Sequence, residues 1–174
     1  MMKTQILIFI LSFGLIMTKA QKKDVFDVAR TGTVLEMKAF TKENAEAINT
    51  YDSMGFSPLI LACYRGNTEV AEFLIENVKD LNYESKEGTA LAALCINYNK
   101  VLVEKLLQKG ANPNTSDSQG NTPLLWAIKR SNVELVQLLL NNNANRNVKD
   151  SLGISAFEYA VRTNNLKIIN LLKN

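Results

Sequence analysis

Side chains that could do chemistry are scarce in this 174-residue chain. It contains no histidine, which removes the commonest general base, the usual serine and cysteine triads and histidine metal sites. The two cysteines, Cys63 and Cys95, lack C-x-x-C spacing and predict no zinc site. The glycines form no phosphate-binding loop motif. We therefore expect a protein that is not an enzyme and that uses no cofactor and no metal.

A carboxylate pair is the one remaining route to catalysis. Asp117 and Asp150 occupy matching sequence contexts, so a stacked fold could bring them together. A recurring Asp is more typical of a turn, because its side chain accepts hydrogen bonds from the backbone just ahead of it. We interpret both as turn residues. The glycosylation sequon Asn114-Thr115-Ser116 is interpreted as a chance match, since a single short motif carries little weight.

The elements that must position these residues are pairs of short helices. In the stretch 117–147, a turn precedes Thr122 at an expected N-cap and Pro123 at the first helical position, where a missing N–H costs nothing. Apolar residues then recur at helical spacing in two segments, divided by Ser131 and Asn132. Helices this short are marginal alone in water, so each pair must stack on another pair.

The same pattern recurs along the chain. Glycines are separated by 33, 32 and 33 positions, and asparagines keep the same steps: Gly55, Gly88, Gly120 and Gly153, and Asn49, Asn82, Asn114 and Asn147. A hydroxyl residue opens each expected first helix: Ser57, Thr89, Thr122 and Ser155. One residue is missing between Gly88 and Thr89. The chain resembles the ankyrin repeat, which has a period of 33 residues and a T-P-L-H-x-A motif.

This resemblance implies an all-α solenoid of stacked helix-turn-helix units with hairpin-like loops. The motif's histidine is replaced in every unit, by Ile60, Ala92, Leu125 and Glu158. Leu94 stands where the other units have a small alanine. We therefore expect a fold held more by apolar contact than is usual for the family, and a looser second full repeat.

The N-terminal residues 1–20 are predicted to be a cleaved export signal. Lys3 supplies the positive region, an apolar run extends from Ile6 to Met17, and Thr18-Lys19-Ala20 forms a small-x-small cleavage site. The run is short for a bilayer span, and an uncleaved membrane anchor is the alternative. Similarity to exported bacterial ankyrin-repeat proteins implies a periplasmic or secreted location.

Residues 21–174 are expected to form one ankyrin-repeat domain. It consists of an N-terminal cap at 22–51, full repeats at 52–84, 85–116 and 117–149, and a C-terminal cap at 150–174. Cys63 and Cys95 occupy the same position of consecutive repeats. Packed helices lie about 8 to 10 Å apart, whereas bridged Cα atoms are rarely beyond about 7 Å. We expect two buried thiols and no disulfide.

Net charge gives little guidance about the partner. The full chain has a formal charge of +3, and removal of Lys3 and Lys19 with the signal would leave 18 basic and 17 acidic residues. A balance this close to zero favours neither nucleic acid nor a membrane surface.

The resemblance implies that the hairpin tips and the exposed side of the first helices form a concave binding face. On the tips the candidate residues are Tyr51, Met54, Phe56, Lys86, Glu87, Gln119 and Leu152. On the first helices we place Arg30, Tyr64, Lys129 and Arg162 at one register, and Arg65, Asn97 and Arg130 at the next. These seven form an expected basic ladder. The alternative is a row of solvated helix ends, where cations interact favourably with the helix dipole.

The favoured function is an exported, monomeric, non-enzymatic protein-binding module that acts as an adaptor, inhibitor or stabiliser. Its partner would be a protein, and the basic ladder would receive an acidic segment of that partner. The alternative function is binding of an anionic polymer, either nucleic acid or acidic polysaccharide, through the same ladder. Near-neutral charge and few exposed aromatics disfavour the polymer. Trp126 is interpreted as an inter-repeat packing residue.

Amide hydrogen exchange should be faster at 89–94 than at the equivalent positions of the neighbouring repeats. This segment lacks the proline at the helix start, has a shorter loop and carries Leu94 in place of alanine. In an array, stability comes from contacts between adjacent units, so one weak unit opens first. Equal protection in all three full repeats would contradict this expectation.

Overall fold

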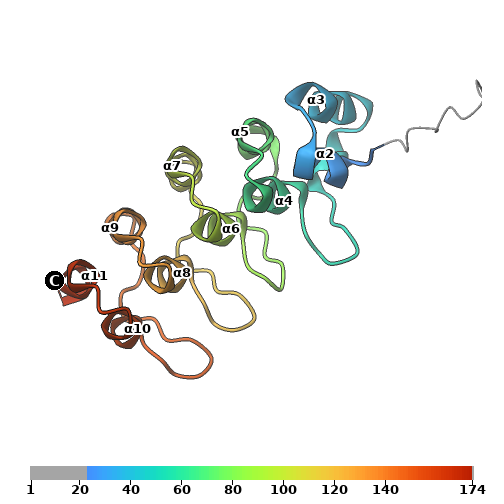
Figure 1. Cartoon of the computed structure of the whole chain (residues 1–174). Coiled ribbons are helices and arrows are strands. Elements are labelled where there is room, and N and C mark those ends of the chain that lie inside the picture. Colours follow the sequence, from blue (N-terminus) through green and yellow to red (C-terminus); the bar gives the residue numbers. More distant parts are fainter. Residues whose placement is uncertain (1–22, 174) are drawn as a thin grey trace, which may run out of the picture.

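The computed structural model describes residues 23–173, in which helices stack in pairs along one axis (Figure 1). The predicted export signal lies outside these residues. The helices are α2 (Val25–Thr31), α3 (Val34–Glu43), the 3-10 helix η1 (Ala45–Asn49), α4 (Pro58–Arg65), α5 (Thr68–Asn77), α6 (Ala90–Ile96), α7 (Lys100–Gln108), α8 (Pro123–Lys129), α9 (Val133–Asn141), α10 (Ala156–Arg162) and α11 (Leu166–Lys173). The described chain contains only isolated β-bridges at its loops. The predicted all-α solenoid is confirmed.

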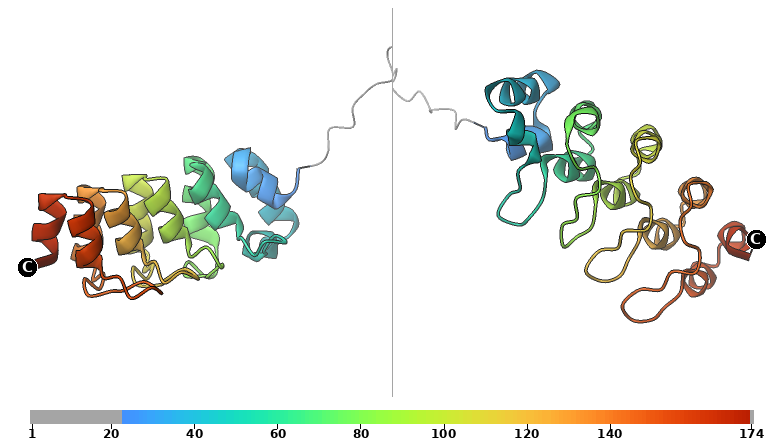
Figure 2. Two further views of the ribbon diagram at one scale, coloured as in Figure 1. Left: turned by 60° about the horizontal axis from the view of Figure 1, so that its bottom comes forward. Right: turned by 180° about the vertical axis from the view of Figure 1, so that it is seen from behind.

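Even-numbered helices form the inner row, and long loops extend from it on one side (Figure 1). Odd-numbered helices form the outer row. The same two rows are seen from two further directions in Figure 2. Each inner helix packs on the next inner helix, as α2 does on α4 and α4 on α6. The apolar core therefore runs the whole length of the stack.

Hydroxyl N-caps begin the inner helices, as the sequence predicts. The side chains of Ser57, Thr89, Thr122 and Ser155 each accept a hydrogen bond from the backbone N–H three residues later. This bond satisfies one of the amides that a helix start leaves without a partner. Pro58 and Pro123 occupy the first helical positions.

Both cysteines are buried, as predicted, and both are free thiols. Burial raises the pKa of Cys63 to about 12, and it raises the pKa of Cys95 further. Each thiol is therefore protonated and unreactive at neutral pH. Leu94 is also fully buried, so the core accommodates this larger side chain at the position of Ala62 and Ala127.

The periodic asparagines join each repeat to the next. The side-chain oxygen of Asn49 accepts a hydrogen bond from the Lys79 backbone N–H (3.0 Å). Asn82 accepts from Asn112 N–H (2.7 Å) and Asn114 accepts from Asn145 N–H (2.7 Å). We call Asn49, Asn82 and Asn114 the asparagine ladder. These hydrogen bonds set the distance between neighbouring units. They lie on the side of the stack where the outer helices end.

Asn114 uses both ends of its side-chain amide in this ladder. Its nitrogen donates to the backbone oxygen of Asn143 at 3.0 Å, while its oxygen accepts from Asn145. A glycan would be attached to that nitrogen and would disturb the bond to Asn143. The geometry thus supports the interpretation of the sequon as a chance match.

Aspartates close the hairpin tips. One carboxylate oxygen of Asp52, Asp117 and Asp150 accepts backbone hydrogen bonds from the residues two and four positions later. The turn interpretation of Asp117 and Asp150 is confirmed. In the second full repeat Ser85 takes this place, and its backbone N–H donates to Gly88 O at 3.1 Å across a loop one residue shorter.

Replacing Asn114 by alanine should lower the free energy of unfolding by about 1–2 kcal/mol, because two hydrogen bonds between repeats are lost. Urea unfolding followed by circular dichroism measures this difference. Asn147→Ala is the matched control, since Asn147 has the same periodic position but its side chain bonds no other repeat within residues 23–173. Equal losses in the two variants would show that the ladder adds nothing to stability.

Candidate functional site

A hollow of about 450 Å³ opens between the loops and the inner helices of the first two full repeats. We call it the groove hollow. Residues from four successive units line it: Arg30, Met54, Phe56, Ile60, Leu61, Tyr64, Arg65, Glu87, Thr89, Ala93, Ile96 and Trp126. Most of this lining is apolar, and its charged residues are Arg30, Arg65 and Glu87.

The hollow exists because the second full repeat has one smaller side chain and one residue fewer on this face. Ala93 is the fourth residue after its N-cap, where the other units have Leu61, Trp126 and Tyr159. The residue missing between Gly88 and Thr89 corresponds to Phe56, Asn121 and Ile154 in the other loops. The sequence signal for the site was therefore an alanine among large residues together with a short loop, and Ala93 was not among the predicted site residues.

Exposed apolar side chains surround the opening. Met54 on the first tip is 70% exposed, and Tyr64 at the end of α4 is 50% exposed. Phe56 and Trp126 are partly buried against the core. The indole nitrogen of Trp126 donates to Asp117 Oδ2 at 3.1 Å, which holds the ring in place. Trp126 thus packs against the core, as interpreted from the sequence, and also forms one wall of the hollow.

Arg30 does not have the register predicted for it. Its helix is capped by Asp24, six residues earlier, whereas Tyr64 lies seven residues after its cap. Arg30 therefore corresponds to Cys63 and points toward the next unit. Its guanidinium donates to Asp52 Oδ2 at 2.8 Å, across the boundary between the first two units.

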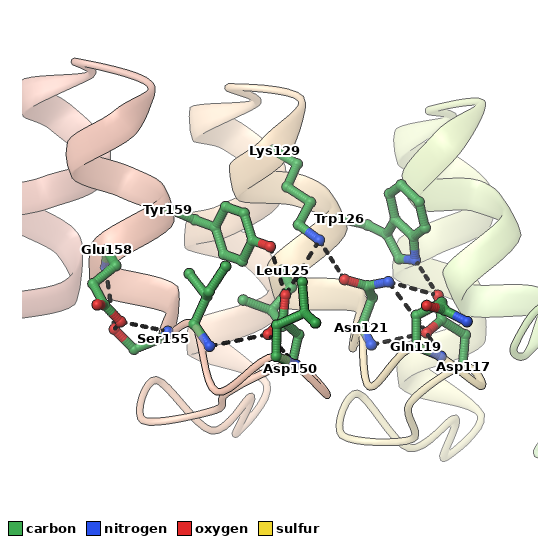
Figure 3. A network of polar contacts seen from close by, with 12 residues as sticks. Asp117, Gln119, Asn121, Leu125, Trp126, Lys129, Asp150, Ser155, Glu158 and Tyr159 are labelled. Atoms are coloured by element: carbon green, nitrogen blue, oxygen red, sulfur yellow. Dashed lines mark hydrogen bonds and ion pairs between the residues drawn. The ribbon is translucent and has the colours of Figure 1, made fainter.

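Lys129 is also engaged within the chain (Figure 3). Its amine contacts the side-chain oxygen of Asn121 and lies 4.0 Å from Asp150 Oδ2. It also lies over the ring of Tyr159, 4.2 Å from the ring centre. Because these partners neutralise and cover the amine, the expected basic ladder is interrupted at Arg30 and at Lys129.

Arg65 and Arg130 are two ladder cations that face solvent. Both are exposed, and neither forms an ion pair within the part of the chain that the structure describes. Arg65 lies 5.9 Å from the ring centre of Tyr64. Asn97, which stands between the two arginines by register, donates to the backbone oxygen of Tyr64 at 3.4 Å.

The remaining predicted site residues are spread along the tips and beyond the hollow. Tyr51 stacks on Tyr83 with ring centres 4.0 Å apart. Lys86 and Gln119 are exposed, and their backbone oxygens accept from the next tip, from Ser118 and Ser151. Leu152 and Arg162 belong to the last unit, away from the hollow, and are exposed. The structure thus gathers only part of the predicted set around one opening: Arg30, Met54, Phe56, Tyr64, Arg65 and Glu87.

Within residues 23–173, no group of three or more acidic or cysteine side chains is arranged to hold a metal ion. Over the same residues, every helix is too short or too polar to cross a bilayer.

The carboxylate of Asp150 should stabilise the fold above about pH 4 and cease to do so in acid. The Tyr159 hydroxyl, 2.5 Å from Oδ2, is the main reason that the pKa of Asp150 is lowered, and the Ile154 and Leu152 amides and Lys129 act in the same direction. A lowered folded-state pKa gives stability that is present above the unfolded value of about 3.9 and is lost as pH falls through the folded value.

Urea unfolding between about pH 2 and pH 7 tests this linkage. The advantage of the wild type over Asp150→Asn should be constant near neutrality and should shrink in acid. Tyr159→Phe removes the main cause of the lowered pKa of Asp150. The stability that this variant loses relative to the wild type should therefore also become smaller in acid. A difference independent of pH would contradict this assignment.

Comparison with known proteins agrees with this architecture. A family model described as ankyrin repeats (3 copies) matches residues 26–117 and 90–174. Ankyrin repeat and SAM domain-containing protein 6 of Rattus norvegicus is 29% identical over 104 residues, which are 59% of this chain and 12% of that protein. BCL-6 corepressor-like protein 1 of Homo sapiens is 29% identical over 84 residues, which are 48% of this chain and 5% of that protein.

A third relative is the inactive serine/threonine-protein kinase TEX14 of Bos taurus, 23% identical over 115 residues that make up 66% of this chain and 8% of that protein. The chain spans 12% or less of each of these relatives, so the likeness concerns the repeats and not the whole proteins. Ankyrin repeats are generally protein-interaction modules and are typically non-enzymatic. Given the stacked helix pairs, their hydroxyl caps and a family match over nearly all of the described residues, the chain belongs to the ankyrin-repeat family.

Proposed function

We propose that this protein binds another protein through the groove hollow and the tips beside it. The observation that carries the proposal is an open apolar hollow, with Met54 and Tyr64 exposed at its opening. Exposed apolar patches with a polar margin are typical of interaction sites, and a pocket flanked by aromatics suits one buried anchor side chain. One copy of the chain builds the site, which is compatible with a monomer.

The partner segment is proposed to be acidic on either side of an apolar anchor. Arg65 is an exposed residue that lines the hollow, and Arg130 lies at the equivalent position two units on. Both guanidinium groups are exposed and free of ion pairs within residues 23–173, so they can receive carboxylates. Such charges steer encounter and fix register more than they add affinity.

We propose that the protein acts as an exported adaptor, inhibitor or stabiliser, in the periplasm or outside the cell. This location depends on the signal-like residues 1–20. Binding of an anionic polymer is less well supported, because two cations of the expected ladder, Arg30 and Lys129, are paired within the chain. Polymer binding would also weaken steeply with salt, whereas an interface with a buried anchor weakens modestly.

Filling the hollow should abolish partner binding while leaving the fold intact. Ala93→Trp introduces the residue that the next repeat already has at this position, Trp126, so we expect the scaffold to accept it. The experiment is capture of partners from the exported fraction with wild-type and variant bait, followed by mass spectrometry and titration of the retained protein. Affinity should fall by about tenfold or more, as for loss of a central anchor. Tyr64→Ala, at an exposed position, is the second variant.

Arg65→Glu combined with Arg130→Glu should weaken the same complex and reduce its salt dependence. Lys42→Glu combined with Arg146→Glu makes the same change in charge away from the hollow and serves as the control. Retention of the partner by Ala93→Trp and by Tyr64→Ala would refute the site. Recovery of nucleic acid or polysaccharide alone would favour the polymer instead.

A further inference from the structure

The groove hollow contains the place of one large side chain in a row that continues along the inner helices. The fourth residue after the N-cap is Leu61 in α4, Trp126 in α8 and Tyr159 in α10. In α6, which packs between α4 and α8, this residue is Ala93. Leu61, Ala93 and Trp126 all line the hollow. An occupant over Ala93 would therefore have a leucine on one side and an indole ring on the other.

The two rings of this row end in hydrogen-bond donors that are both in use (Figure 3). The indole nitrogen of Trp126 donates to Asp117 Oδ2 at 3.1 Å, and the hydroxyl of Tyr159 donates to Asp150 Oδ2 at 2.5 Å. Each ring is thus joined to the aspartate of its own tip. Tyrosine and tryptophan usually have such a partner when their rings are covered. A ring placed over Ala93 would need an acceptor from the second full repeat.

The second full repeat has a carboxylate that is free to accept. Ser85 takes the place of the tip aspartate, and its hydroxyl donates to the Gly88 oxygen at 2.8 Å. Glu87, two residues after Ser85, is exposed and lines the groove hollow. Its backbone N–H donates to Ser85, but within residues 23–173 no group donates to its carboxylate. The acceptor for a ring in this repeat is therefore Glu87.

The charges of the lining give an occupant its direction. Glu87 lies in the tip before α6, on the side where the inner helices begin. Arg65 is the last residue of α4, so it lies where the inner helices end. The third charged residue of the lining, Arg30, is paired with Asp52 at 2.8 Å. A donor directed toward the tip and an acidic group directed toward the helix ends would match this arrangement.

We infer that the anchor of the partner is the side chain of a tyrosine or tryptophan, which lies over Ala93 and donates its O–H or N–H to the carboxylate of Glu87. The inference rests on the proposed protein-binding function and adds the chemical class of the anchor. The ring packs between Leu61 and Trp126, where contact with the indole adds to the burial of apolar surface. Acidic neighbours of the ring in the partner chain reach Arg65.

Other anchors satisfy only part of the lining. Phenylalanine would keep the contact with Trp126 but would bring no donor to Glu87. Leucine would lose the donor and the ring contact together. Lysine would bring a donor to Glu87, but Arg65 would repel its charge and the apolar lining would remain poorly covered.

Short peptides with one variable residue test the inference without the natural partner. The probe is N-acetyl-Asp-Glu-Gly-X-Gly-Glu-Asp-amide, in which X is tyrosine, tryptophan, phenylalanine, leucine or lysine. Titration into the isotope-labelled full chain, followed by amide NMR, gives the dissociation constant and the place of binding. The tyrosine peptide should bind about fivefold more tightly than the phenylalanine peptide, as for one added hydrogen bond. The leucine and lysine peptides should bind more weakly than either, and the amides of Ala93 and Ile96 should shift.

Glu87→Ala separates the hydrogen bond from the charge of the peptide. The tyrosine and phenylalanine peptides have the same acidic flanks, so repulsion by Glu87 cancels in the ratio of their dissociation constants. This ratio should fall to about one in Glu87→Ala, because the acceptor is gone. It should keep its wild-type value in Glu84→Ala, which removes the same charge from an exposed residue of the same loop that does not line the hollow.

The outcomes distinguish the anchor from the site. Leucine or lysine peptides that shift the hollow amides and bind as tightly as the tyrosine peptide overturn the inference and leave the proposed site standing. A tyrosine-to-phenylalanine ratio that Glu87→Ala does not change overturns the inference in the same way. Peptides that shift no amide of the hollow lining, or that bind Ala93→Trp as tightly as the wild type, overturn the proposed site as well.

Discussion

The structure depends on the inability of its helices to stand alone. None of the helices within residues 23–173 exceeds ten residues, a length that is marginal in water without packing partners. Each helix pair is stable only when adjacent pairs cover its apolar sides, so the chain is stabilised by the boundaries between units. Apolar contact supplies most of that stabilisation, and the asparagine ladder fixes the rise between units. Hydroxyl side chains cap the inner helices α4, α6, α8 and α10, and aspartates close the tips before three of them.

The same turns decide which charges are free for a partner. Each tip aspartate uses one carboxylate oxygen for its own turn and the other for a side-chain donor: Arg30 for Asp52, Trp126 for Asp117 and Tyr159 for Asp150. Two of these donors come from the unit of the aspartate, and Arg30 comes from the preceding unit. The first full repeat has Leu61 where Trp126 and Tyr159 stand, and leucine has no proton to donate. Arg30 therefore supplies the side-chain donor to Asp52, and its charge is not free for a partner.

Period, caps and helix pairs could be predicted because they depend on residues close in sequence. The turn role of Asp117 and the burial of both cysteines followed from the same spacing. The register of Arg30 could not be predicted from the glycine steps, because the first unit has no preceding turn and its inner helix α2 is one residue shorter than α4. The pairing of Lys129 involves Asn121, Asp150 and Tyr159 from two units, so it needs the stacked geometry. The groove hollow could be recognised in the sequence only from a small residue, Ala93, at a position where the other units have large side chains, beside a loop that is one residue shorter.

The origin of the groove hollow has a kinetic consequence. The space results from the small side chain of Ala93 and from the residue missing after Gly88, and no segment covers it within the described residues. Its walls are held by the scaffold, as the bond from Trp126 to Asp117 illustrates. An occupant therefore meets a preformed opening, and little ordering of the receptor accompanies binding. For the proposed complex we therefore expect association to be limited by the encounter of the two molecules and by ordering of the incoming segment, with no opening step required of residues 23–173.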